Sequence, residues 1–169
     1  IPDAFVPALI ERVKIVKGGD GVRYGTNALG GVIVIENRWP DAHERTLISE
    51  SSYGSFSSFR QRLCMMGSGE RVGVRAAGTV FTTEGHRAGA GGSSAAGQVG
   101  MRVHAADNWT IGAGEKIVRL EGNDPGPTTH PTTDHWFRVT RSTTSLHADG
   151  SLGSARLLAR AWLNAGQQA

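Results

Sequence analysis

The chain of 169 residues has one cysteine, few aromatic residues and no long apolar run. Because Cys64 has no second cysteine to pair with, an internal disulfide is excluded. The longest aliphatic run covers only residues 32–35, whereas a helix that crosses a bilayer needs about 20 apolar residues. We therefore expect no transmembrane helix. Strands that cross a bilayer need only about 9–11 residues each, so this absence leaves a strand-built membrane protein open.

Proline and net charge are also low, and glycine is high. The 6 prolines and the lack of any glycine period exclude collagen and proline-rich disorder. The 24 glycines amount to roughly twice the average usage of about 7%, which favours many turns and close backbone approaches. A net charge of +3 is a mild excess, and we expect no nucleic-acid partner.

Apolar and polar residues alternate in several segments, as they do along β-strands. The clearest runs are residues 71–80, 98–105 and 154–165. The last is rich in Ala, Leu and Arg, which are strong helix formers, but the repeated upstream pattern favours a strand. Noisier segments of the same kind are residues 46–53, 58–66, 109–120 and 135–147. The sequence thus predicts about seven strands, averaging near ten residues.

After the first hairpin the expected connections alternate between short and long. Tight turns are predicted at residues 67–70, 106–108 and 148–151, and long loops at 86–96 and 121–134. Residues 54–57 would be an unusually short first loop on the side of the long loops. Outer-membrane barrels have short turns on one rim and longer loops on the other. A soluble antiparallel sheet also alternates, but strands of about ten residues exceed its usual length of about 5–6. The polar positions, rich in Arg, Gln, Ser and Thr, would suit a hydrated lumen.

Residues 10–36 carry the most specific pattern in the chain. An Ile-Glu-Arg run is followed by a Lys-Gly turn, a Tyr-Gly pair and a Gly-Gly-Val-Ile strand. This combination resembles the C-terminal part of the plug domain of TonB-dependent outer-membrane receptors. Gly19 stands where that family usually has proline, and Val34 where it usually has asparagine. The matching plug-motif residues are Glu11, Arg12, Lys17, Gly18, Tyr24, Gly25, Gly30 and Gly31.

The resemblance implies a mainly β fold with three parts. Residues 1–36 would be the C-terminal part of a plug domain, 37–43 a linker, and 44–169 the first strands of the barrel. About seven antiparallel strands would then form an incomplete transmembrane β-barrel, since barrels of this family have about 22 strands. The start of the plug would precede residue 1 and most of the barrel would follow residue 169. We expect the isolated chain neither to transport nor to insert stably, because open sheet edges are costly in lipid.

The resemblance also implies a function and partners. Such receptors lie in the outer membrane of Gram-negative bacteria, in contact with its lipid, and take up scarce nutrients in an energised process. The nutrient is commonly a ferric siderophore or a similar metal chelate. The energy arrives through TonB, which would act on a plug segment absent from this chain. No resident cofactor and no catalytic activity are implied.

Five arginines are the candidate ligand-attracting residues, because the alternation places them on one polar face. They are Arg71, Arg75, Arg102, Arg156 and Arg160. They would either solvate the lumen and pair with the plug or form an attractive field for an anionic chelate. Three tryptophans, Trp109, Trp136 and Trp162, are candidates for aromatic belts at the membrane interfaces, with ordinary packing as the alternative.

Other chemistry is weakly indicated. His130, Asp134 and His135 lie close in sequence, but their spacing is not that of a zinc motif, and a solvated loop is favoured. No serine lies in a nucleophile-elbow pattern, so we expect no enzyme. The alternative to a receptor is a soluble or surface-exposed all-β module for binding or adhesion.

Overall fold

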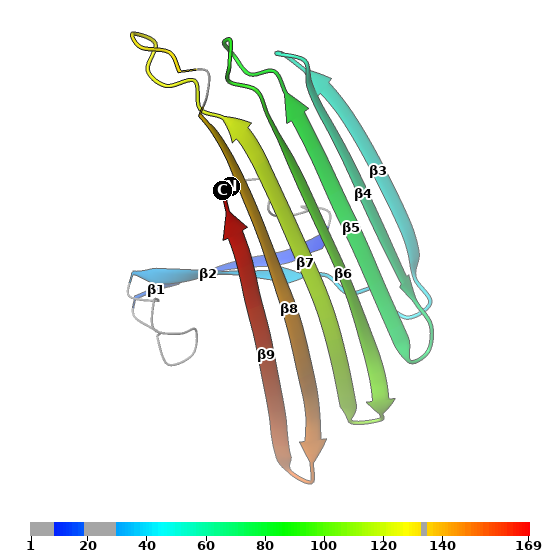
Figure 1. The fold of residues 1–169 in the computed structure, drawn as a ribbon. Helices are drawn as coiled ribbons and strands as arrows, with labels where there is room; N and C mark the ends of the chain where they lie inside the picture. Colours follow the sequence, from blue (N-terminus) through cyan, green and yellow to red (C-terminus); the bar gives the residue numbers. More distant parts are fainter. Residues whose placement is uncertain (1–8, 19–29, 133–134) are drawn as a thin grey trace. The chain divides into compact units, whose positions relative to one another are not determined.

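A computed structural model of the chain describes residues 9–18, 30–132 and 135–169. Within these ranges the chain forms nine β-strands and no helix (Figure 1). None of the described residues belongs to a helix that could span a bilayer. The contacts divide the described chain into a small unit, residues 9–38, and a large unit, residues 39–169. A mainly β fold is therefore confirmed.

The small unit is an antiparallel pair of strands, β1 (Ile10–Lys17) and β2 (Gly31–Asn37). A register shift at Glu11 opens the pairing, after which Arg12 lies opposite Glu36. Glu36 also accepts a hydrogen bond from Lys14 Nζ at 2.5 Å. Arg12 Nε lies 4.0 Å from the second oxygen of the same carboxylate, so Arg12 and Lys14 both pair with Glu36 across the two strands.

Glycines lie at the end of β1 and at the start of β2. Gly18, with φ of +93°, follows the last residue of β1, Lys17. Gly31 has φ of +136°, and a Cβ added there would lie only 2.6 Å from the carbonyl oxygen of Val16. An added Cβ at Gly30 meets nothing within 4 Å, so only the second glycine of the pair is required by close approach. Tyr24 and Gly25 lie outside the described residues.

The large unit is a seven-stranded antiparallel sheet in which every strand pairs with its neighbours in sequence (Figure 1). Its strands are β3 (Arg45–Gly54), β4 (Ser58–Ser68), β5 (Val72–Thr83), β6 (Gly92–Ala106), β7 (Trp109–Asn123), β8 (Trp136–Leu152) and β9 (Ala155–Gln168). The predicted number of strands is confirmed, and so is the strand at residues 154–165. The strands are longer than predicted, at 10 to 17 residues.

After the first hairpin, short and long connections alternate, as predicted, although β6 begins at Gly92, inside the long loop expected at residues 86–96. The β4–β5, β6–β7 and β8–β9 turns lie at one end of the sheet, and the longer β5–β6 and β7–β8 loops at the other, with the β3–β4 turn (Figure 1). The two long loops touch each other, because the Arg87 guanidinium donates a hydrogen bond to the carbonyl oxygen of Gly126. Below, the end of the strands that carries the β3–β4 turn and the two long loops is called the loop end. The end that carries the β4–β5, β6–β7 and β8–β9 turns is called the turn end.

The predicted turn at residues 148–151 is wrong. The strand continues to Leu152, and the chain turns at residues 153–154, where Gly153 has φ of +60°. Gly150 has a different role, because it pairs with Trp109 and a Cβ added there would lie 2.3 Å from the Trp109 ring. The Asp-Gly pair that looks like a turn in the sequence therefore makes room for an indole within the sheet.

Candidate functional site

The seven-stranded sheet has two chemically different faces, because side chains alternate along every strand. The arginine face is defined by the residues that share the side of Arg75. Its strand cations are Arg60, Arg62, Arg75, Arg102, Lys116, Arg141, Arg156 and Arg160, and its strand carboxylates are Glu50 and Asp149. This face therefore carries a large excess of positive charge, at a density that the net charge of the whole chain does not reveal.

A tryptophan from the segment before β3 lies on the arginine face. The guanidinium carbon of Arg75 lies 3.9 Å from the centre of the Trp39 ring, and that of Arg102 lies 5.1 Å from it. The imidazole of His147 approaches the same ring, with centroids 6.2 Å apart. Arg102 Nη2 also lies 3.5 Å from the carbonyl oxygen of Pro40. Trp39, Arg75, Arg102 and His147 are called the Trp39 cluster.

Two glycines make room for the Trp39 cluster. A Cβ added at Gly100 would lie 3.1 Å from Arg75 Nε and 3.2 Å from Trp39 Cη2. A Cβ added at Gly112 would lie 2.1 Å from Cε1 of the His147 ring. Neither glycine has a positive φ, so space rather than backbone conformation explains them. Glycine on one strand therefore leaves the space that a bulky aromatic or basic side chain from a neighbouring segment occupies.

The Trp39 cluster is suited to hold an anion. Cations over an aromatic face are attracted by its quadrupole, which helps to hold two guanidinium groups side by side. The Nε of Arg102 is shielded from solvent and has no hydrogen-bond partner among the described residues. Arg160 lies directly opposite His147 on the next strand and adds a further cation nearby. Guanidinium forks match carboxylate and other planar oxygen groups in geometry as well as in charge.

The five predicted arginines divide into three groups. Arg75 and Arg102 meet at Trp39, and Arg160 lies beside His147. Arg156 is already paired, since it donates hydrogen bonds of 3.2 and 2.7 Å to the Asp149 carboxylate. Arg71 lies in the turn between β4 and β5 rather than on a strand.

Sequence reasoning missed Trp39 and His147. The only available signal for Trp39 was an aromatic residue followed by proline inside an expected linker, where an apolar side chain has no reason to be unless it docks. His147 was part of a predicted strand, but its neighbours depend on the register of three strands.

The second face of the sheet is apolar and open to solvent in the structure. Half or more of the surface of Val99, Ile111, Ile117 and Leu146 is exposed, at 58%, 50%, 51% and 56%. Of the three tryptophans, Trp136 and Trp109 lie on this apolar face, near the loop end and the turn end respectively. Trp162 shares the side of Arg160 and so lies on the arginine face.

The loop end of the apolar face carries a charged group. Glu121 Oε1 accepts hydrogen bonds of 2.6 Å from both Arg119 Nε and Arg138 Nε. The hydrogen bond from Arg119, followed by that from Arg138, holds the pKa of the Glu121 carboxyl below its usual range. The group thus combines two cations with one anion and has a net charge of +1.

No group of three or more potential metal ligands occurs in the part of the chain that the structure describes. His130 and His135 lie in or beside the β7–β8 loop, and Asp134 lies outside the described residues. Comparison of the sequence with protein-family models and with curated proteins gives no match. Function therefore has to be inferred from the two faces of the sheet and the residues on them.

Proposed function

We propose that this chain supplies the end of the plug and the first strands of the barrel wall of a TonB-dependent receptor in the outer membrane of a Gram-negative bacterium. The receptor would take up a scarce nutrient, carried as an anionic metal chelate such as a ferric siderophore. The observation that carries the proposal is an apolar band that runs obliquely across one face of the sheet.

The edge of the band nearest the turn end shifts further toward that end from β5 to β9. Val72 on β5 is in register, through the intervening strands, with Ala148 on β8 and Ala159 on β9. The band nevertheless continues beyond that row, to Leu152 and Ala155. Four residues correspond to about 13 Å along a strand, over a lateral distance of about 19 Å between β5 and β9. The band is therefore inclined to the rows by roughly 35°, which matches the strand tilt of about 35–45° in membrane barrels.

The loop-end edge of the band moves in the same direction. Val80 on β5 is in the row of Arg119 on β7, so the band on β7 ends earlier, at Ile117. Along β5 the band covers residues 72–80, about 26 Å of strand. After correction for the tilt its height is roughly 22 Å, close to the apolar band of about 25 Å in outer-membrane barrels.

The opposite face supports a hydrated lumen. Arginine, serine and threonine are its commonest side chains and its cations outnumber its carboxylates, although apolar residues such as Met66, Phe81 and Leu120 also lie on it. Soluble monomers rarely expose an apolar patch as large as the band, which argues against the soluble module. A cationic inner wall would raise the local concentration of an anionic chelate.

Cysteine labelling in membranes tests the proposal. In a Cys64→Ser background of the complete reading frame, Ala159→Cys and Arg160→Cys place adjacent thiols on opposite faces. We expect the protein in the outer-membrane fraction, with the thiol of Arg160→Cys modified by a charged, water-soluble maleimide and that of Ala159→Cys protected. Recovery in the soluble fraction, or equal modification of both thiols in membranes, would refute the proposal.

Uptake measurements test the role of the arginines. Arg102→Gln with Arg160→Gln should lower uptake of chelated iron-55 by roughly tenfold at low salt, because electrostatic attraction of a charged ligand is of this order. The matched control is Arg156→Gln combined with Asp149→Asn, since it removes a paired arginine without changing the net charge of the face. Equal uptake by all variants would remove the arginine face from the proposal.

A further inference from the structure

The arginine face carries a hollow near the loop end of the sheet. Its volume is about 210 Å³, and residues of the four adjacent strands β5 to β8 line it. Phe81 comes from β5, and Ser94 on β6 and Leu120 on β7 lie in the same row. Phe137 comes from β8 and lies two residues further toward the loop end, opposite Gly122. Below, this site is called the Phe81 hollow. Apolar side chains therefore gather at one place on a face rich in arginine, serine and threonine.

Two glycines give the Phe81 hollow its depth. Gly92 on β6 and Gly122 on β7 both line it, and neither has a positive φ. A Cβ added at Gly122 would lie 2.8 Å from Cζ of the Phe137 ring. A Cβ added at Gly92 would lie 3.0 Å from the carbonyl oxygen of Glu121. Space rather than backbone conformation therefore explains both glycines.

A buried hydroxyl without a partner lies in the Phe81 hollow. Only 6% of the surface of Ser94 is exposed, and its Oγ has no hydrogen-bond partner among the described residues. Thr83 also lines the hollow, but its hydroxyl oxygen already accepts hydrogen bonds from Ser58 Oγ and from the amide of Gly85. Buried polar groups are nearly always hydrogen-bonded, because an unmade bond is costly. Ser94 therefore points to a ligand that supplies the missing partner.

A guanidinium lies beside the Phe81 hollow. Arg60 pairs with Phe81 in the β4–β5 ladder, and its guanidinium carbon lies 4.6 Å from the centre of that ring. Glu121 also lines the hollow, but its carboxylate pairs with Arg119 and Arg138 on the apolar face. The charge nearest to the rings is therefore positive, and it favours a ligand group that carries negative charge.

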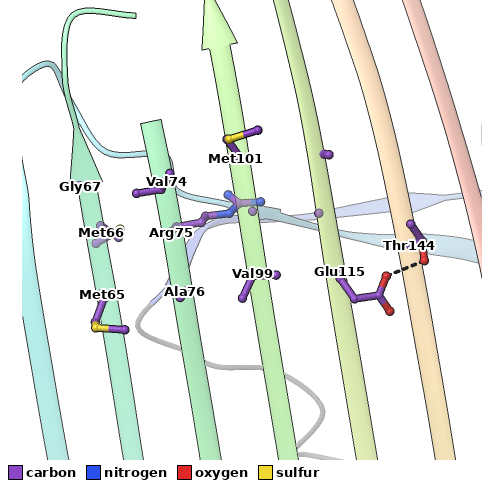
Figure 2. A pocket seen from close by; sticks show the side chains of 13 residues that line it. Met65, Met66, Gly67, Val74, Arg75, Ala76, Val99, Met101, Glu115 and Thr144 are labelled. Atoms are coloured by element: carbon purple, nitrogen blue, oxygen red, sulfur yellow. Dashed lines mark hydrogen bonds between the residues drawn. The ribbon is translucent and has the colours of Figure 1, made fainter. Parts of the chain in front are cut away.

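A larger hollow, of about 720 Å³, lies on the apolar face beside Val99 (Figure 2). Its polar side chains are already engaged. The Glu115 carboxylate points to Thr144 and accepts the hydrogen bond of that hydroxyl (Figure 2). The Arg75 guanidinium packs on the Trp39 ring. Nothing in this lining asks for a specific ligand, whereas Ser94 does so in the Phe81 hollow.

We propose that the Phe81 hollow binds one hydroxylated aromatic ring, a phenol or catechol arm of the anionic iron chelate. The inference rests on the proposed function, because the chelate must reach the arginine face. An apolar cavity of about 150 Å³ holds benzene, so the hollow has room for a ring with one or two hydroxyl groups. Phe81 and Phe137 supply aromatic contacts, and Ser94 supplies a hydrogen bond to a ring oxygen. Arg60 attracts the negative charge that phenol and catechol oxygens carry when they bind iron.

Binding of two iron complexes tests the ring site. The protein from its complete reading frame is purified from outer membranes and titrated calorimetrically with the iron(III) complex of a tricatechol chelator. Ferric citrate, which is anionic but has no ring, is titrated in parallel. We expect the wild type to bind the tricatechol complex more tightly. Ser94→Leu fills the hollow and should weaken that binding by about tenfold or more, because ring contacts and a hydrogen bond are lost together. Its binding of ferric citrate should not change.

A smaller change isolates the hydroxyl and adds no volume that could disturb the fold. Ser94→Ala should weaken binding of the tricatechol complex about fivefold, the factor that one hydrogen bond contributes. The matched control is Thr79→Val. The Thr79 hydroxyl is also buried and without a partner among the described residues, but it does not line the Phe81 hollow. This variant should bind like the wild type.

The outcomes separate the ring site from the proposed function. Equal affinity of the wild type for both complexes would overturn the ring site, and so would unchanged tricatechol binding in Ser94→Leu. A loss in Thr79→Val as large as that in Ser94→Ala would overturn it as well. With the protein in the outer membrane, these results leave the proposed function standing, whereas recovery of the protein in the soluble fraction overturns both.

Discussion

The contact between Trp39 and Arg75 should be measurable as a coupling energy. Arg75 lies 3.9 Å from the ring centre and is half-buried, whereas Arg102 lies 5.1 Å away. Cation–π contacts contribute about 0.5–1 kcal/mol when exposed and about 2 kcal/mol when desolvated. We therefore expect coupling of about 1–2 kcal/mol for Trp39 with Arg75, and about 0.5–1 kcal/mol with Arg102.

A double-mutant cycle isolates this term. Trp39→Leu and Arg75→Met remove the ring and the charge but keep apolar volume, and the cycle subtracts what each loses alone. Trp39→Leu by itself should lower the free energy of unfolding by about 2–3 kcal/mol, below the range of about 3–5 for full truncation of a buried Trp. Unfolding of the protein from its complete reading frame in denaturant is followed by the circular dichroism of the strands, since removing a tryptophan alters the fluorescence.

A surface pair provides the control for this cycle. Arg138 lies 5.4 Å from the Trp136 ring, and both residues are exposed, so their coupling should be about 0.5 kcal/mol or less. Coupling between Trp39 and Arg75 no larger than that of the control pair would show that Trp39 is not held by the arginine face. The Trp39 cluster would then lose its physical basis.

Three further predictions concern other parts of the chain. Gly31→Ala should destabilise the β1–β2 pair by about 2 kcal/mol or more in hydrogen exchange, and Gly30→Ala by less than about 0.5, since only Gly31 has positive φ and a carbonyl oxygen at 2.6 Å; equal effects would contradict this. Only 1% of the surface of Cys64 is exposed, so its thiol should resist maleimide in the folded protein and react in denaturant. Fast labelling of the folded protein would show that Cys64 is accessible to solvent and would contradict this burial. Arg62→Gln breaks an exposed pair with Glu50 and should lower the free energy of unfolding by about 0.5 kcal/mol or less, an effect that should vanish in high salt. Thermal melting at several salt concentrations measures it, and a larger loss that does not change with salt would be inconsistent with a surface pair.

Alternation predicted the strands well because it is a local property of the sequence. The runs around Val74, Met101 and Leu157 all became strands with the expected side chains on each face. Turn positions were less predictable, because glycines near residues 150 and 153 compete and the register with β7 decides between them. Gly150 is needed opposite Trp109, which leaves Gly153 to turn the chain.

The candidate site was only half predictable. The sequence placed Arg75, Arg102 and Arg160 on one face, which needs nothing beyond the two-residue period of a strand. It did not predict that Trp39 would pack against Arg75 and Arg102, because that depends on where residues 39–44 lie on the sheet. The Phe81 hollow was equally hidden, since Phe81 and Ser94 are adjacent only through the register of β5 and β6.

The neighbour-only pairing of the sheet has a consequence for how the chain assembles. Every ladder from β3 to β9 joins strands that follow one another in sequence, through connections as short as two residues. Contact order is therefore low for so large an all-β sheet. Each hairpin closes only a short loop, so the entropy cost of loop closure is small at every step. Each new hairpin can form against the edge that the previous one leaves. The sheet can grow strand by strand in the order of synthesis, with no pairing that must wait for a distant part of the chain.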